Sequence, residues 1–263
     1  KMVASAKLHK AQAAIESMLP YERRLHHILT DFMSNCTEVT SPFIVKREVK
    51  KVAVVVFASN TSLCGGFNAN VIRHLVDLLA EYKPLGLENI LVFPVGKKVA
   101  DAVRKLGFRI EGDFQHMADK PSYQEAADLA ADLMKRFLHG DVDKVELLYN
   151  HFKSTASQIL TRETYLPIDL NNEKKEEERT IDYILEPSAE ELMQEMLPKV
   201  LRMKMFTVLL DSNAAEHAAR TMAMQIATDN ANELLQELTV MYNKSRQQSI
   251  TNELLDIVGG SMA

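Results

Sequence analysis

The residues whose types come closest to a binding site form a glycine-containing turn at positions 59–68. The run reads S-N-T-S-L-C-G-G-F-N and follows an apolar segment. Backbone N–H groups at the start of a helix attract phosphate, so a turn of this kind between a strand and a helix is a candidate nucleotide site. Within the run, Cys64 precedes two glycines near a helix start, which makes it a candidate reactive thiol.

The surrounding residues argue against both kinds of chemistry. The turn lacks the G-x-G-x-x-G pattern, and no acidic residue ends the next predicted strand, which closes with F-P-V-G at 93–96. The G-K-K run at 96–98 is not a P-loop, because Leu91 stands where the first glycine belongs and Lys98 replaces Ser or Thr. We therefore expect a tight turn that needs glycine, a buried small side chain at Cys64, and no nucleotide or other cofactor.

No other set of catalytic or metal-binding residues stands out in the sequence. The eight histidines are scattered, and neither H-E-x-x-H nor a Cys/His cluster occurs, so we expect no metal site. G-x-S-x-G is also missing. Two cysteines, Cys36 and Cys64, are too few for a disulfide framework and suit a reducing compartment. The residues alone therefore predict a protein without catalytic residues of its own.

Composition and charge narrow the class of protein further. The 263 residues carry a net charge of −5, which disfavours a nucleic-acid binder. No apolar run approaches the roughly 18 residues of a membrane-spanning helix, and no secretory signal stands at the start. Residues 1–51 hold nine Lys/Arg and five Asp/Glu, whereas residues 188–263 hold six and ten. Opposite net charges favour association of the two ends.

The positions of glycine and proline indicate a long helix at the C-terminal end. All nine glycines lie between Gly65 and Gly260, and residues 199–258 contain neither glycine nor proline. A stretch of that length without breakers is typical of one helix, on the order of 90 Å long at about 1.5 Å per residue.

Apolar stripes at both ends of the chain suit a coiled coil. Their members alternate spacings of four and three residues, and Glu22 is the only polar member of the first stripe. Pro20 lies inside that stripe, where a bend or a lost hydrogen bond is expected. Such stripes also suit the core faces of an ordinary bundle, but two of them at opposite ends favour an antiparallel coiled coil. The members are Ala4, Leu8, Ala11, Ile15, Met18, Glu22, Leu25, Leu29 and Phe32, then Leu201, Met205, Val208, Ser212, Ala215, Ala219, Met222 and Ile226, and, after a shift of one residue, Ala227, Ala231, Leu234, Leu238 and Met241.

Between the ends, strand-like and helix-like segments alternate, which predicts an α/β domain with a mostly parallel sheet. We expect an N-terminal coiled-coil helix at 1–51, a Rossmann-like domain at 52–187 and a long C-terminal coiled-coil helix at 188–263. The charged run at 171–179 is expected to be a solvated loop, with a functional acidic patch as the alternative. Strands are expected at 52–58, 90–95, 108–110, 145–150 and 157–166, and helices at 68–82, with Asn68 as the candidate N-cap, at 97–106 and at 123–138.

Three separated motifs stand out along the chain: Lys1–Leu8, Leu63–Asn68, and a C-terminal set made of Ala227–Ala231, Tyr242–Gln247, Ile250–Glu253 and Gly259-Gly260. These motifs resemble the gamma subunits of F-type ATP synthases of the bacterial type. They occur in the family's order and span essentially the whole chain. The chain departs from the family's pattern at its start, which looks truncated, and at 60–62, where N-T-S replaces the usual Asp, basic residue and Gly. If that Gly uses positive φ, Ser62 implies a different turn.

The resemblance implies a rotor shaft in the central stalk of the synthase. The terminal helices would enter a hexamer of three alpha and three beta subunits, while the α/β domain would contact the epsilon subunit and the membrane ring of c subunits. Rotation would bias the three catalytic beta subunits differently and so couple ion flow to ATP synthesis or its reverse. The chain would hold no cofactor or metal, bind no nucleic acid and insert no segment into the membrane. It would lie peripherally on the cytoplasmic face of the bacterial inner membrane.

The resemblance also assigns contact residues for the alpha and beta subunits. Arg246, Gln247 and Thr251 match family positions that hydrogen-bond a catalytic subunit, and an arginine suits a detachable grip on a carboxylate. Glu216 and Arg220 match a second polar contact. The alternative for each of these is a solvated helix face. Apolar contacts are weakly directional and suit a sliding bearing, whose tip we expect at Ile250, Leu254, Ile257 and Val258.

Two other classes of protein remain as alternatives. One is a Rossmann-like enzyme with helical arms, which the missing phosphate motif disfavours. The other is a non-catalytic coiled-coil scaffold, which would form homo-oligomers and ignore alpha and beta subunits.

Overall fold

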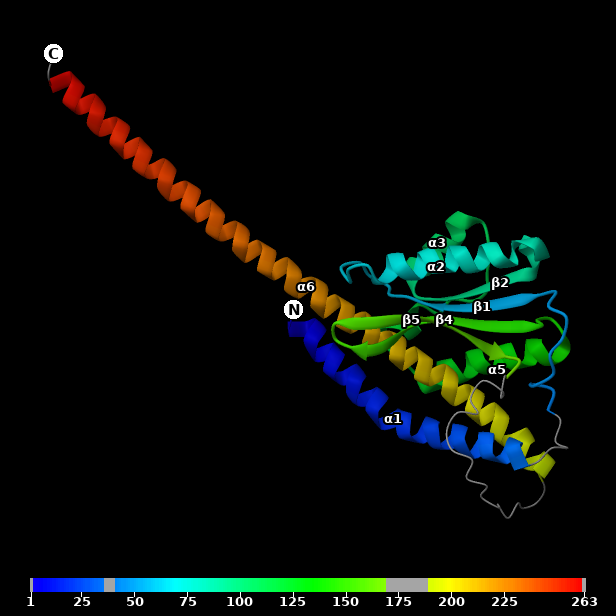
Figure 1. Cartoon of the computed structure of the whole chain (residues 1–263). Helices are drawn as coiled ribbons and strands as arrows, with labels where there is room; N and C mark the ends of the chain where they lie inside the picture. The colour runs from blue at the N-terminus through cyan, green and yellow to red at the C-terminus, as the bar shows by residue number, and fades with distance from the viewer. Residues whose placement is uncertain (1, 36–40, 169–188, 262–263) are drawn as a thin grey trace. The chain divides into compact units, whose positions relative to one another are not determined.

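The computed structural model describes residues 2–35, 41–168 and 189–261, in two compact units, Lys1–Met222 and Ala223–Ala263. The first unit contains a five-stranded sheet with helices on both faces (Figure 1). The second unit is the C-terminal part of one long helix. The run at 171–179 lies outside the described residues, and the division into segments 1–51, 52–187 and 188–263 stays a prediction.

The strands and helices expected between the terminal helices are all present in the described part of the chain. The strand at 145–150 is longer than expected, and the short helix α4 and the 3-10 turns η1 and η2 were not expected. The order is α1 (Met2–Asn35), β1 (Val52–Phe57), α2 (Phe67–Tyr82), η1 (Lys83–Leu85), η2 (Leu87–Asn89), β2 (Ile90–Val95), α3 (Lys97–Leu106), β3 (Arg109–Ile110), α4 (Gln115–Asp119), α5 (Tyr123–His139), β4 (Lys144–Ser154), β5 (Ser157–Leu166) and α6 (Ala189–Ser261).

The sheet has the strand order β3-β2-β1-β4-β5 and is mostly parallel, as predicted. The central strand β1 runs parallel to β2 and β4, with Val54 opposite Val92 on one side and Glu146 on the other. β3 is parallel to β2, and β5 is antiparallel to β4. Helices cover both faces, so every residue of β1 is buried, which is why its sequence is apolar throughout.

Alternate residues of β1 belong to two separate cores. Val54 and Val56 face α2 and α3, whereas Val55 and Phe57 face α5 and the first part of α6. Figure 1 shows α2 and α3 on one side of the sheet and α5, α6 and α1 on the other. This alternation follows from the two-residue period of a strand.

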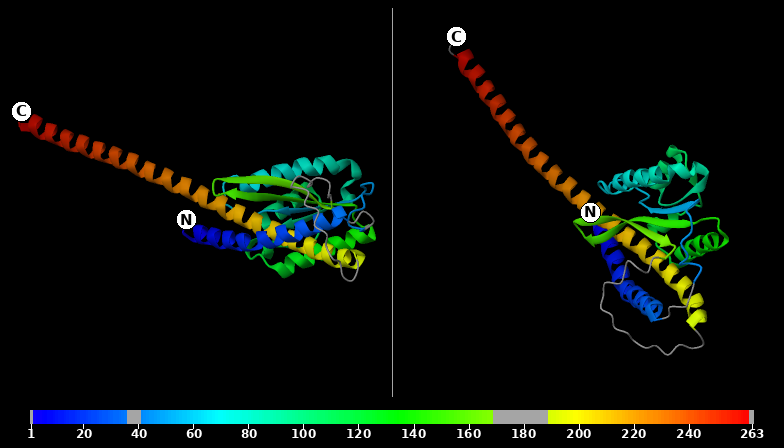
Figure 2. Two further views of the ribbon diagram at one scale, coloured as in Figure 1. Left: turned by 60° about the horizontal axis from the view of Figure 1, so that its bottom comes forward. Right: turned by 45° about the vertical axis from the view of Figure 1, so that its right-hand side comes forward.

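Helix α1 packs antiparallel to the first half of α6, as the fold prediction required. Ala11 and Ile15 contact Leu210 and Ala214, and Figures 1 and 2 show the two helices side by side. Helix α1 continues through Pro20. The side chains of Leu29 and Phe32 lie outside the described residues.

The first part of the stripe predicted to pair α6 with α1, from Leu201 to Val208, faces the sheet instead. Leu201, Met205 and Val208 are buried in the core beneath the sheet, while α1 contacts a different face of α6 around Leu210 and Ala214. The prediction chose the wrong partner because α6 is buried on two sides here, so one apolar stripe describes only one of its contacts. Helix α6 also begins before its proline, Pro198, since the apolar burial of Met193 and Leu197 anchors the earlier turns.

Candidate functional site

The turn between β1 and α2 folds back on itself through side-chain hydrogen bonds. The backbone N–H of Ser59 donates to Asn68 Oδ1 at 3.1 Å, and Asn68 Nδ2 donates to Cys64 Sγ at 3.1 Å. Asn68 was predicted to cap α2, but the capping position is Gly66, because the helix begins one residue earlier, at Phe67. Cys64 is buried, as predicted for a small side chain in a tight turn.

Asn60 joins this turn to two other elements. Its Oδ1 accepts a hydrogen bond from Lys97 N at 2.8 Å, and its Nδ2 donates one to Gln115 O at 2.8 Å. The site therefore needs a donor and an acceptor on one side chain, which an amide supplies and an ionised carboxylate does not. This requirement accounts for Asn60 where the family pattern has Asp.

Ser62 itself does not have a positive φ. Among the described non-glycine residues, the positive φ belongs to Leu63, at 68°. A left-handed conformation is costly for a leucine, and the side chain of Leu63 is 74% exposed. The left-handed non-glycine residue of this turn is thus the one directly after Ser62.

Protein groups occupy the start of α3, where a phosphate would bind in a nucleotide site. Lys97 N donates to Asn60 Oδ1, and Lys98 N donates to Ser59 O at 3.2 Å. Gly96 has a φ of 115°, and a Cβ there would lie 2.2 Å from Ala58 O. The glycine is thus required by a close approach of two backbones, which supports the tight-turn interpretation of both glycine motifs.

Helix α6 crosses the carboxyl ends of the central strands. Open α/β sheets bind ligands at such ends, beside the point where strand order reverses. In this chain that point lies between β1 and β4. Beside it, between α6 and the ends of β1 and β2, lies a cavity of about 10 Å³, enough for about one water molecule. Its lining includes Phe57, Ser59, Val95, Leu209, Ser212 and Glu216.

Arg220 ties α6 to the turn after β1. Its Nη1 donates to Ser62 O at 2.5 Å, and its Nη2 donates to Thr61 Oγ1 at 2.8 Å and also contacts Glu216. Glu216 is buried, and burial alone would raise its pKa, but His217 and Arg220 outweigh this and hold the pKa below its ordinary value. The solvated-face alternative is therefore wrong for this pair, whose contact with another subunit stays a prediction.

Two further polar residues of α6, which the sequence reasoning missed, attach the helix to the domain. Asp211 accepts hydrogen bonds from Phe152 N at 2.8 Å and from His151 Nδ1 at 2.6 Å. Burial raises the pKa of Asp211, and the bonds from His151 and Phe152 only partly oppose this. Asn213 Nδ2 donates to Ala118 O at 2.9 Å. The sequence signal that could have identified Asp211 is its position directly after the apolar Leu209 and Leu210, in a helix that belongs to the core.

The remaining predicted site residues lie on the second unit. Arg246, Gln247 and Thr251 are exposed, and Thr251 Oγ1 donates to Gln247 O within the helix. The predicted bearing tip is exposed as well. Exposure ranges from 49% to 68% over the tip residues Ile250, Leu254, Ile257 and Val258.

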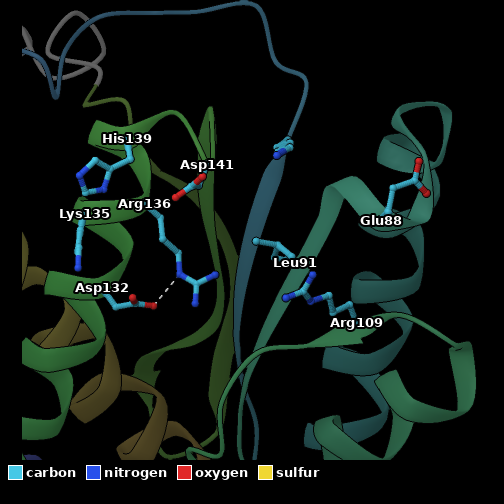
Figure 3. A pocket seen from close by; sticks show the side chains of 9 residues that line it. Glu88, Leu91, Arg109, Asp132, Lys135, Arg136, His139 and Asp141 are labelled. Carbon is cyan, nitrogen blue, oxygen red and sulfur yellow. Dashed lines mark hydrogen bonds and ion pairs between the residues drawn. The ribbon is translucent and has the colours of Figure 1, made fainter.

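A cavity of about 370 Å³ lies near the amino ends of the parallel strands, away from this turn. Asp132 and Arg136 of α5 lie on one side of it, opposite Leu91 and Arg109 of the sheet (Figure 3). Arg136 bonds Asp132 and Glu111, so much of the local charge is already paired. The lining mixes basic and acidic groups, and it does not select an anion or a cation.

Neither a metal-binding cluster nor a membrane-spanning helix occurs among the described residues. They contain no group of three or more His, Cys, Asp or Glu placed to hold a metal ion. None of the described helices combines the length and the apolar composition that a bilayer crossing requires.

Comparison with known proteins identifies the family. The family model described as ATP synthase matches residues 1–263. The ATP synthase gamma chain of Phocaeicola vulgatus is 80% identical over 265 residues, covering 100% of this chain and 92% of that protein. The gamma chain of Parabacteroides distasonis is 51% identical over 261 residues, covering 99% and 90%.

Solved structures show the same fold at lower identity. A chain of the Euglena gracilis mitochondrial ATP synthase aligns with a TM-score of 0.56 and 20% identity, over 98% of this chain and 95% of that one. A chain of the Tetrahymena thermophila mitochondrial ATP synthase, from its central stalk and c-ring, aligns with a TM-score of 0.57 and 19% identity, over 86% and 99%. With full-length matches to bacterial gamma chains, this chain belongs to the ATP synthase gamma-chain family.

Proposed function

We propose that this chain is the rotor shaft of a bacterial F-type ATP synthase, with no catalytic residues of its own. Its partners are three alpha and three beta subunits, the epsilon subunit and the membrane ring of c subunits. The solved relatives come from central-stalk and F1/c-ring assemblies, which supports this set. The chain lies peripherally on the cytoplasmic face of the inner membrane. In segments, 1–51 and 188–263 make the shaft and 52–187 makes the foot.

The observation that carries the proposal is the division of α6 into two kinds of surface. Up to Ala218 the helix is built into the α/β domain, whereas residues 226–258 are exposed throughout. Large apolar side chains exposed in such numbers mark a surface that another protein covers. They include Ile226, Leu234, Leu238, Met241, Tyr242, Ile250 and Leu254. A surface of this kind suits a helix that turns inside a ring of other subunits.

Arg246 and Gln247 supply directional contacts to a catalytic subunit on this exposed helix. Arginine offers a planar fork that grips a carboxylate bidentately, and the grip releases when geometry changes. The apolar tip around Leu254 turns against an apolar sleeve with few bonds to break. A shaft that contacts three equivalent subunits differently biases their conformational equilibria in turn.

Reconstitution tests the proposal. The chain is mixed with alpha and beta subunits, and multi-site ATP hydrolysis is measured with the wild type and with Arg246→Ala and Gln247→Ala. Lys244→Ala and Gln248→Ala are the controls for Arg246→Ala and Gln247→Ala, because they remove a cationic and an amide side chain that lie about 160° and about 100° around the same exposed helix from Arg246 and Gln247, respectively. We expect hydrolysis to require the chain and to fall in the two contact variants but not in the controls.

The outcomes separate the parts of the proposal. If hydrolysis requires the chain but all four variants behave alike, the shaft role stands and the contact residues are wrong. If the chain forms homo-oligomers and does not associate with alpha and beta subunits, the shaft role is wrong and a coiled-coil scaffold takes its place.

A further inference from the structure

The part of α6 nearest the end of the first unit has little side-chain bulk with which to hold its orientation. The most buried residues of this part are Ala214, Ala215 and Ala218, which are 0% exposed, and Ser212 is buried as well. Small side chains give a smooth helix surface, and apolar contacts are non-directional. Packing shape alone therefore offers little resistance to rotation of α6 about its own axis in this part. The larger residues before Leu210 offer more.

Directional polar contacts reach α6 in this same stretch from three elements. Asp211 accepts bonds from the β4 residues His151 and Phe152. Asn213 donates to Ala118 at the end of α4, and Arg220 donates to the turn after β1. At 3.6 residues per turn, positions two and nine residues after Asp211 lie about half a turn away from it. The bonds therefore hold the helix from roughly opposite sides.

We propose that Asp211, Asn213 and Arg220 form a torsional grip that stops α6 from turning within the α/β domain. The inference rests on the proposed rotor function, in which torque passes between the foot and the C-terminal part of α6. A bond on one side of the helix is stretched by rotation in either direction, and a second bond on the opposite side prevents the helix from rolling about the first. Asp211, Asn213 and Arg220 are thus positioning residues for torque transfer.

A rotation assay measures the stiffness of this connection. Alpha and beta subunits are fixed to a surface and arrested with a non-hydrolysable ATP analogue, and a bead is attached at Lys105→Cys on the exposed end of α3. The readout is the variance of the bead angle. The grip variant is Asn213→Ala with Arg220→Lys, which keeps the positive charge but loses the fork. The matched control is Asn89→Ala with Arg162→Lys, because these residues make the same kinds of bond within the domain without contacting α6.

We expect the angular variance to rise about twofold in the grip variant, since two of the three attachments are weakened, and to stay at the wild-type value in the control. Equal variances in the two double variants overturn the grip. If the grip variant does not assemble, Asn213→Ala alone is compared with Asn89→Ala under the same criterion. If the wild-type chain neither assembles with alpha and beta subunits nor rotates, the proposed function itself fails, which is a different result.

Discussion

The carboxylate of Glu22 on α1 lies 4.0 Å from Nζ of Lys204 on α6, within an interface that is otherwise largely apolar. Glu22 is the one polar member of the N-terminal stripe, and Lys204 also contacts Glu163 of β5 at 3.0 Å. A polar pair at such a position helps to set the register of two helices, at a cost in stability.

Replacing Glu22 with leucine should therefore stabilise the chain slightly. The ion pair is long and weak, whereas a leucine would bury apolar surface worth about 1 kcal/mol. Lys204 keeps its contact with Glu163. Denaturant unfolding of Glu22→Leu measures the change, with the exposed Glu16→Leu as the control that should stay near zero. A loss of stability in Glu22→Leu would show that the pair contributes net free energy.

Glu146 is the centre of a buried ion network beneath α2. Its carboxylate lies 2.6 Å from Lys144 Nζ and 2.9 Å from Arg162 Nε, and Glu146 is only 2% exposed. Glu146→Gln should cost about 2 kcal/mol, because the partly buried Lys144 and the more exposed Arg162 lose the buried carboxylate that they share. Glu81→Gln, which removes a more exposed partner of Arg162, should cost well under 1 kcal/mol. Denaturant unfolding at pH 7 measures the loss of stability in each variant. Equal losses in the two variants would contradict the importance of the network around Glu146.

The same network predicts an acid-sensitive stability. Burial alone would raise the pKa of Glu146, but Arg162, Lys144 and Tyr82 outweigh it, so the pKa in the folded state lies below the usual 4.5. The stabilisation is present above the unfolded-state value and is lost as pH falls from there through the folded-state pKa. Unfolding measured on both sides of this window should show the wild type losing more stability on acidification than Glu146→Gln.

Asp211 should show the opposite pH dependence. Burial raises its pKa in the folded state above the usual 3.8, despite the bonds from His151 and Phe152. The folded state therefore binds the proton more tightly than the unfolded state, and this group adds stability as pH falls through the raised pKa. Asp211→Asn retains an acceptor for Phe152 N and should remove this contribution. Parallel pH profiles of the variant and the wild type in that window would refute the assignment.

Gly96 and Gly107 provide a matched pair for backbone strain. Both have positive φ, but a Cβ at Gly96 would meet Ala58 O at 2.2 Å, whereas one at Gly107 has nothing within 4 Å. Gly107→Ala should cost about 1 kcal/mol for the left-handed conformation alone. Gly96→Ala should cost clearly more, because the backbones of the β1 and β2 ends must separate. Thermal unfolding of both variants compares the two costs, and similar midpoints would show that the strand ends part easily.

The order of strands and helices followed from the sequence because these signals are local. A continuous apolar run at 52–57 needs burial on both faces, and a breaker-free stretch at 199–258 needs a helix. The resemblance to the family could be recognised because its motifs, such as Tyr242–Gln247, are short runs of consecutive residues. A nucleotide site could be disfavoured from the sequence for the same reason, because the glycine spacing of a nucleotide-binding motif is also a local signal and is absent here.

The contacts that hold α6 in the domain were decided by the tertiary structure. His151 and Asp211 are 60 positions apart, and Thr61 and Arg220 are 159 apart. Nothing local to either residue specifies its partner, because the pairing depends on how the sheet and the helix pack. Asn68 illustrates the same limit: its residue type suits a helix cap, but its side chain bonds the preceding turn instead. Periodicity shows that a face of α6 is buried, and only the folded chain shows what covers it.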